Sequence, residues 1–350
     1  MNFKRMWAMF RARNHEFFRD RAAFGWNFLF PFLLVAGFSL IFGGRGHQDF
    51  KVGLFPLPVG EVVAPNQHGV PQRFAASPRL RFVGFVDRQT GLASLRHHDI
   101  DFLLHAGPPP HDYWVNDSSP NGDLVENIFK AALIPPDALL PARRQQIQGR
   151  QVRYLDWLFP GILTMNMMFS ALWGVGYVVV RYRKEGVLKR LKATPVTALE
   201  YLTAQMLSRI FLLMFTTVIV WVGSDLIFDF HVEGHYADLI LVFLLGSLSL
   251  TSLGLVVAAR GTSEEFASGL LNFIGWPMMF LSEVWFSLEG APRWIRLISD
   301  MLPLTHMLRA IRKIMNEGAA LSDLGLEIGV MLAMTLLFLT VAAALFSWNR

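Results

Sequence analysis

Histidines and carboxylates occur at two places with spacings that suit a metal ion. His97 and His98 are followed by Asp99 and Asp101, and the segment His231–His235 places two histidines four residues apart. Imidazole and carboxylate groups are zinc and copper ligands. However, neighbours in sequence rarely converge on one ion, and the second pair lies in a short loop that contains glycine. We therefore interpret both as solvated polar positions and expect no metal site.

The residues that catalysis or nucleotide binding would need are missing. The sequence has no cysteine, which excludes disulfides and thiolate chemistry. No G-x-x-x-x-G-K-[ST] segment occurs, so no phosphate loop can hold ATP. The runs Leu239–Ala259 and Gly329–Trp348 contain no His, Asp or Glu, which disfavours an enzyme embedded in a membrane. We expect no enzymatic activity and no cofactor in this chain.

A few polar residues lie within or beside long apolar runs. Asn166 and Asn272 would need partners in lipid, and we expect interhelical hydrogen bonds of about 1 kcal/mol. Glu283 lies where an apolar run ends, and a carboxylate at such depth needs a cation or water. Arg293 or Arg296 could pair with Glu283, or the carboxylate could form an outer gate. Both interpretations stay open.

A highly charged segment, "RYRKEGVLKRLKATPVTALEYL" at residues 181–202, separates two apolar runs. Val187, Leu188 and Leu191 fall on one face of a short helix, and charged residues surround them. Pro195 stops this helix because the residue before a proline leaves the helical conformation. A helix this short is not stable alone. Its apolar face should therefore pack on the membrane surface or on a cytoplasmic protein partner.

Blocks of apolar residues must position these groups. The chain has 350 residues, of which 53% are hydrophobic and 17% are charged. A helix needs about 20 apolar residues to cross the bilayer, and the two shorter blocks reach this length if Arg209 snorkels and the fifth span ends irregularly. The pattern predicts an α-helical polytopic membrane protein with six transmembrane helices rather than a soluble protein. The uncharged blocks are Ala22–Gly44, Trp157–Val180, Ile210–Ser224, Leu239–Ala259, Phe266–Ser282 and Gly329–Trp348.

The distribution of basic residues predicts the orientation. Residues 1–21 and 181–202 are rich in Lys and Arg, whereas the loop after the third block carries only acidic charges. Short basic loops stay on the cytoplasmic side, so we place both termini in the cytoplasm of a multi-pass protein of the cell (inner) membrane. The net charge of +5 then belongs to these loops and does not indicate nucleic acid.

The remaining segments predict two further elements. Residues 1–21 form an amphipathic interfacial helix that leads into the first span, 22–44, because the aromatic residues fall within about 120° of the helical wheel. The alternative is a basic flank that only sets topology. Residues 45–154 alternate apolar residues in a strand–helix–strand pattern, with a further strand at Lys51–Phe55 and a helix near Asp123–Leu133. We expect a small α/β extracytoplasmic domain there, followed by five further spans in 155–350.

Two segments resemble the permeases of type-two ABC exporters. "RYRKEGVLKRLKATPVTALEYLTAQMLSR" is similar to their cytoplasmic loop, in which a Glu-Gly, a short basic helix and a Thr-Pro lead into the third span. "FLSEVWFSLEGAPRWIRLISDMLPLTHMLRAIRK" is similar to their outer re-entrant segment, here about 282–313. The six-span order and the outer domain also fit, so the resemblance covers nearly the whole chain. Glu283 departs from the small or apolar residue expected at its position.

The resemblance implies how the chain works. It would be the membrane subunit of an ATP-driven exporter for a hydrophobic or amphipathic substrate, paired with a second permease, identical or related. ATP and Mg would be held by a separate cytoplasmic ABC ATPase. The helix at about 184–194 would be the coupling helix that docks on this ATPase. Its contact residues would be Glu185, Gly186, Leu188, Arg190 and Leu191.

By the same resemblance, the translocation path lies between the second and fifth spans of the two permeases. Thioether and aromatic side chains there would suit apolar ligands, although ordinary helix packing or lipid contact explains each of them as well. A transport-inactive membrane sensor that binds a ligand through its outer domain is the alternative function. The path residues would be Met165, Met168, Phe169, Trp173, Phe273, Trp276, Met279 and Phe280.

Overall fold

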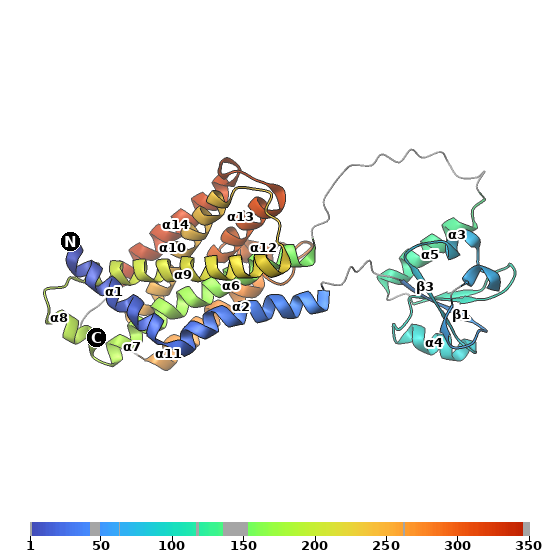
Figure 1. Cartoon of the computed structure of the whole chain (residues 1–350), viewed down its shortest axis with the longest axis horizontal. Coiled ribbons are helices and arrows are strands. Elements are labelled where there is room, and N and C mark those ends of the chain that lie inside the picture. Colours follow the sequence, from blue (N-terminus) through green and yellow to red (C-terminus); the bar gives the residue numbers. More distant parts are fainter. Residues whose placement is uncertain are drawn as a thin grey trace. The chain divides into compact units, whose positions relative to one another are not determined.

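The computed structural model describes residues 2–42, 50–62, 64–116, 119–135, 153–261 and 263–345. The chain divides into a helical unit, Met1–Gly43 with Arg150–Arg350, and a small unit, Gly44–Gly149. Each unit has its own hydrophobic core. Figure 1 shows the helices and strands of both units. The predicted runs 22–44 and Gly329–Trp348 extend at one end beyond the described residues.

The small unit is an α/β fold built on a five-stranded sheet of order β2-β3-β1-β4-β5. The central strand β1 is parallel to β3 and β4, and the two short edge strands are antiparallel to their neighbours. The predicted strand–helix–strand unit is present as β3, α4 and β4. The elements are β1 (Phe50–Phe55), β2 (Gly60–Glu61), η1 (Pro65–His68), α3 (Gln72–Ala75), β3 (Leu80–Gly84), α4 (Arg88–Arg96), β4 (Phe102–His105), β5 (Tyr113–Val115) and α5 (Pro120–Leu133).

Alternation along the strands of the small unit sends side chains to two separate cores. Phe102 packs with Phe74 of α3 and Phe129 of α5 on one face, while Leu103 packs with Leu95 of α4 on the other. His97 forms the C-cap of α4, and His98 follows with a positive φ of 59°. These two histidines thus end a helix, and the described residues contain no cluster of three or more His, Asp or Glu that could hold a metal.

The helical unit contains long helices and several short pieces. α1, α7 and α8 lie at one end of the unit, and α12 lies toward the other (Figure 1). The elements are α1 (Phe3–Arg19), α2 (Arg21–Phe42), α6 (Tyr154–Ala171), the π-helical turn η3 (Leu172–Tyr177), α7 (Val178–Lys184), α8 (Val187–Lys192), α9 (Ala198–Phe228), α10 (Tyr236–Arg260), α11 (Glu264–Leu281), α12 (Arg293–Ser299), α13 (Pro303–Glu317), η4 (Leu321–Leu324) and α14 (Gly325–Leu345).

Within the described residues, 5 helical segments are long and apolar enough to cross a membrane. The predicted fifth span, α11, is not among them: it is shorter, because Glu264 and Glu265 occupy its first turn. The apolar remainder of α11 extends about 24 Å, against about 30 Å of hydrocarbon. The five segments are Phe24–Ile41, Tyr154–Lys184, Leu199–Phe228, Tyr236–Ala259 and Leu321–Leu345.

The polar residues predicted to lie in the apolar runs have hydrogen-bond partners in the helical unit, and only some of these partners agree with the predictions. Arg209 does not snorkel: it is 8% exposed, and its guanidinium donates to the Ser170 carbonyl and packs against Gly174 of the π-helical turn. Asn166 donates to the Asn27 carbonyl of α2 at 3.5 Å, which is the expected interhelical bond. The prediction for Asn272 is wrong, because its side chain accepts from Trp276 one turn along the same helix.

The segment after α11 folds back on the helical unit. The chain turns at Glu283, which has a positive φ of 62°, and continues through α12 into α13. α13 is largely buried and packs against α6, α10 and α14. The Thr305 hydroxyl donates to Ser282 at 2.9 Å, which joins the start of α13 to the end of α11. This segment corresponds to the predicted re-entrant piece at about 282–313.

A glycine on α6 is required where the returning segment touches that helix. A Cβ at Gly161 would lie 2.7 Å from the backbone oxygen of Val284. We expect Gly161→Ala to lower the free energy of unfolding by about 1–3 kcal/mol, because the backbone must shift to relieve the overlap. The measurement is the midpoint of thermal denaturation of the purified protein in detergent.

The matched control is Gly37→Ala in α2, where nothing lies within 4 Å of the added Cβ. Gly37→Ala should leave the midpoint unchanged or raise it slightly, since alanine favours helix. An equal loss in both variants would show that the α6 contact is not specific.

Candidate functional site

The segment 184–194, predicted as a coupling helix, contains the short helix α8, whose side chains divide into a buried and an exposed group. Gly186 precedes it with a positive φ of 71°, a conformation that favours glycine. Leu188 is 1% exposed and belongs to a cluster with Val179 and Tyr201, and Leu191 packs against the same cluster. The apolar face therefore packs on this chain itself, not on the membrane surface or a partner as the sequence suggested.

The exposed group on and beside α8 is charged. Glu185, Lys189 and Arg190 are exposed, whereas Leu188 is inaccessible to a partner in this conformation. Leu188 and Leu191 hold α8 on the rest of the chain. The charged side chains lie on the accessible side of the helix.

The last turn of α7, residues 181–184, connects α8 to three other helices. Arg181 pairs with Glu16 of α1 at 3.1 Å, and Lys184 pairs with Glu264 of α11 at 3.1 Å. Arg183 is buried and donates to carbonyls at the end of α10: Ala258 at 2.9 Å, Ala259 at 3.3 Å and Gly261. A cation is favourable at the carbonyl end of a helix, so Arg183 caps α10.

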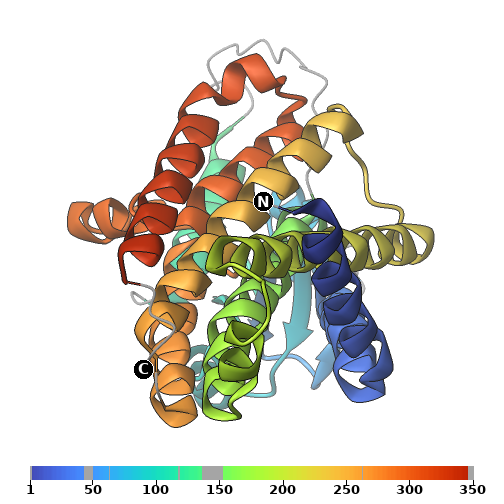
Figure 2. The ribbon, with the colours of Figure 1, turned by 90° about the vertical axis from the view of Figure 1, so that its left-hand side faces the viewer.

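α1 contacts the chain on both sides of α8. Glu16 accepts hydrogen bonds from the Tyr182 hydroxyl and from Arg13, the latter at 2.7 Å. Burial opposes ionisation of Glu16, but these donors and the nearby guanidiniums outweigh it and hold its pKa below the usual value. Beyond α8, the backbone N–H of Asn2 donates to Glu200 at 2.5 Å. Figure 2 views the helical unit from this end, with α1 in dark blue.

The N-terminal cap of α9 explains where Glu200 is held. The Thr197 hydroxyl accepts from the Glu200 N–H at 3.3 Å, and the Glu200 carboxylate accepts from the Thr197 N–H at 3.0 Å. This reciprocal pair satisfies two backbone donors at the start of the helix. The Arg5 guanidinium donates to the neighbouring Pro195 carbonyl. The prolyl turn that ends α8 is thus held by both α1 and α9.

The predicted path residues also divide into two groups. Phe273 is 76% exposed, and Trp276 and Phe280 on the same helix are exposed as well. The Phe169 ring of α6 contacts Trp276 at 5.7 Å and Trp173 at 6.0 Å between ring centroids. These residues form one apolar surface along α6 and α11. Three predicted path residues lie instead in the core, out of reach of a ligand in this conformation: Met165, Met168 and Met279.

Glu283 has two basic neighbours, and both lie on α13. Its carboxylate is 3.9 Å from Arg309 and 4.0 Å from Arg312. The prediction that Arg293 or Arg296 would pair with it is therefore wrong, because the return of the chain through α13 brings later arginines to the site. Arg312 also donates to the Glu283 carbonyl at 2.8 Å and to the Trp157 carbonyl at 3.2 Å.

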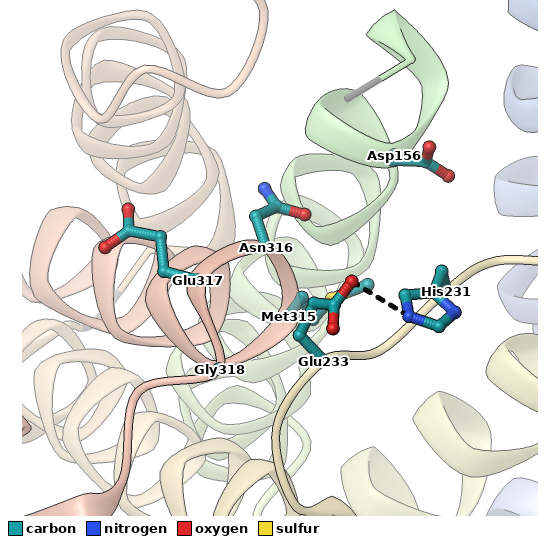
Figure 3. A pocket seen from close by; sticks show the side chains of 7 residues that line it. All are labelled: Asp156, His231, Glu233, Met315, Asn316, Glu317 and Gly318. Atoms are coloured by element: carbon teal, nitrogen blue, oxygen red, sulfur yellow. Dashed lines mark ion pairs between the residues drawn. The ribbon is translucent and has the colours of Figure 1, made fainter. Parts of the chain in front are cut away.

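A pocket of about 320 Å³ opens near the start of α6 and the end of α13 (Figure 3). The His231 imidazole lies 3.0 Å from the Glu233 carboxylate at the edge of the pocket. The Glu233 N–H donates to the Met315 carbonyl, which holds the 229–235 loop to α13. His231 is thus engaged with Glu233, and His235 is the residue before α10. The lining residues are Asp156, His231, Glu233, Met315, Asn316, Glu317 and Gly318.

Several membrane-length helices with exposed apolar surfaces define a multi-pass membrane protein. The profile described as "ABC-2 family transporter protein" matches residues 22–344. The chain belongs to this family and is an ABC-2 type permease. Family membership makes it a membrane subunit of an ABC transporter.

Named relatives agree with this assignment. The chain is 26% identical to ABC transporter G family member 20 of Dictyostelium discoideum over 57% of its own length and 27% of the relative's. It is 22% identical to the daunorubicin resistance ABC transporter permease protein DrrB1 of Streptomyces coeruleorubidus. That match covers 55% of this chain and 69% of the relative. It is 25% identical to the probable multidrug ABC transporter permease YbhS of Escherichia coli K12. That match covers 54% of this chain and 48% of the relative. The match thus covers only part of these proteins.

Proposed function

We propose that this permease forms the path of an ATP-driven exporter for hydrophobic or amphipathic substrates, together with a second permease chain and a separate ATPase. The exposed apolar surface of α6 and α11 is the observation that supports it most, because it combines Phe169, Trp276 and Phe273 on two neighbouring helices. Aromatic surfaces adapt to varied apolar ligands. The names of the Streptomyces and Escherichia relatives suggest drugs as the substrate class.

In this proposal α1, α7 and α8 face the cytoplasm of the inner membrane, and the small unit lies outside. α1 lies at the interface. α11 is the fifth of six spans, and the segment from Glu283 to α13 fills the rest of the membrane thickness that α11 does not cross. The basic residues near α8 support this orientation, since short loops rich in Lys and Arg remain inside. Six spans also return the chain to the side on which it began.

Coupling follows from the two groups of residues at α8. The exposed Glu185, Lys189 and Arg190 would set the docking orientation on the ATPase, because charges at an interface rim direct association. The buried Leu188 joins α8 to α7 and α9. Closure of the ATPase would then move α8 together with the helices held by the last turn of α7. Nucleotide binding would thereby shift the balance between inward-facing and outward-facing forms.

Purification of the complex from gentle detergent, with mass spectrometry of the co-eluting chains, tests the proposal. A stoichiometric polypeptide that carries a phosphate loop is the expected result, and the stoichiometry would show whether the second permease is identical or related. Recovery of this chain alone, under conditions that preserve other ATPase complexes, would favour a transport-inactive sensor.

We expect Phe273→Ala to reduce efflux several-fold, because it removes the most exposed aromatic side chain from the surface of α6 and α11. Daunorubicin is a suitable first probe, and its accumulation in cells is the measurement. The matched control is Leu336→Ala on α14, which removes an apolar side chain that is 67% exposed elsewhere on the unit. Equal effects of both variants would indicate general lipid contact and would count against a path on this surface.

A further inference from the structure

We propose that the exposed face of α1 binds anionic phospholipid headgroups and that this binding controls the coupling segment, residues 181–200. The first part concerns lipid binding alone. The second part rests on the proposed exporter function. The two are tested by separate measurements below.

The exposed face of α1 carries two adjoining stripes. Phe3 and Trp7 are 68% and 48% exposed. Phe18 is 43% exposed and lies on the same side of the helix, about three turns further on. Basic residues form the neighbouring stripe, about 20–100° further round the helix at 100° per residue. The basic side chains are Lys4, Arg11 and Arg19, all exposed.

The rest of α1 packs against the protein. Met6 is buried, and Phe10 packs on Phe211 of α9 with ring centroids 5.8 Å apart. Phe18 also touches Phe215 at the edge of this contact. The exposed sides of the two stripes are therefore free to contact something other than the helical unit.

The basic stripe has no internal partner within the part of the chain that the structure describes. The Lys4, Arg11 and Arg19 side chains form no ion pair there, in contrast to Arg13, which pairs with Glu16 at 2.7 Å. Unpaired cations beside exposed aromatic rings match the boundary of a bilayer, where rings lie at the headgroup level and Lys or Arg reach phosphates. An acidic protein surface or a free phosphate would use the cations but would leave the aromatic stripe in water.

The buried face of α1 contacts both ends of the coupling segment. Glu16 contacts Tyr182 and Arg181 just before α8, and Asn2 contacts Glu200 just after it. A change in the position of α1 on the membrane would thus act on both ends of the coupling segment. Anionic lipid holds α1 at the headgroups and keeps this segment in the arrangement that the ATPase recognises.

Lipid selectivity is the first measurement. The full chain is reconstituted in phosphatidylcholine mixed with phosphatidylglycerol at roughly three to one, with bromine on the acyl chains of one lipid or the other. Quenching of Trp7 fluorescence, obtained as the difference from a Trp7→Phe variant, reports which lipid surrounds α1. We expect brominated phosphatidylglycerol to quench Trp7 more than its fraction in the lipid mixture predicts. This preference for phosphatidylglycerol over phosphatidylcholine should fall about fivefold for each basic residue removed.

The test variant combines Lys4→Gln, Arg11→Gln and Arg19→Gln. Its matched control removes the same charges from exposed positions of the small unit: Lys51→Gln, Arg79→Gln and Arg96→Gln. Loss of selectivity in the test variant alone supports the lipid site. Unchanged lipid selectivity in the test variant overturns the proposal. If the test variant no longer co-elutes with the ATPase in detergent without added lipid, the basic stripe contacts a protein, and the proposal is overturned as well.

Dependence of the ATPase on lipid is the second measurement. With its ATPase, the wild-type chain should stimulate hydrolysis several-fold more in the mixed vesicles than in phosphatidylcholine alone. Tyr182→Phe should keep the lipid selectivity at Trp7 and lose this lipid dependence, because it removes the hydroxyl that donates to Glu16. Retained dependence overturns the link. If the wild-type chain stimulates ATP hydrolysis in no lipid, the exporter proposal and the control of the coupling segment by lipid fail together. The quenching of Trp7 still decides whether α1 binds anionic lipid.

Discussion

Replacing Arg190 with glutamate is expected to abolish stimulation of the partner ATPase, with a loss of at least about tenfold in the stimulated rate. The side chain is exposed on α8 and has no role in the buried cluster that holds this helix. A charge reversal places like charges together across a complementary interface, which costs several kcal/mol. The measurement is ATP hydrolysis by the reconstituted complex, together with co-elution of the two subunits.

The control for Arg190→Glu is Arg96→Glu, which makes the same change at an exposed position of the small unit. Both variants should insert and purify like the wild type. Leu191→Asp is a less specific test, because Leu191 packs on the same chain and its replacement would also loosen α8. If Arg190→Glu stimulates the ATPase normally, docking does not occur through the exposed face of α8.

Local patterns predicted α8 but not what it packs against. The spacing of its apolar residues and the proline after it are enough to predict a short amphipathic helix. Leu188, however, packs with Tyr201 and Ala258, and the second of these lies on a distant helix. Periodicity shows that a face is buried without showing the partner. For the same reason, nothing in residues 181–184 indicated that Arg183 would cap α10 from 75 positions away in sequence.

The predicted path illustrates a second limit. Apolar spans in a membrane protein can face lipid, a ligand or neighbouring helices, and residue type alone does not distinguish these. Met165 and Met168 were grouped with Phe169, yet they are buried inside the helical unit while the Phe169 ring contacts Trp276. Glu283 shows the effect of a chain reversal, since its neighbours come from α13 and not from the nearer Arg293 or Arg296.

Arg312→Leu is expected to produce the largest loss of stability, because this arginine joins three parts of the helical unit. Its guanidinium donates to the carbonyls of Glu283 and Trp157 and stacks on the Trp157 ring at 3.7 Å. Leucine would remove both of these hydrogen bonds and the charged contact with the Trp157 ring. We expect a loss of about 3 kcal/mol in the free energy of unfolding, measured as a lower denaturation midpoint in detergent.

Two further variants separate the sources of this loss. Arg312→Lys keeps the charge but lacks the planar guanidinium that donates to both carbonyls. Its denaturation midpoint should therefore fall between those of the wild type and Arg312→Leu. Arg309→Leu removes an arginine that pairs with Asp300 at 2.6 Å but is more exposed, and it should cost under about 1 kcal/mol. Equal losses for Arg309→Leu and Arg312→Leu would mean that the apolar packing of α13, and not the buried arginine, holds the outer segment against α6.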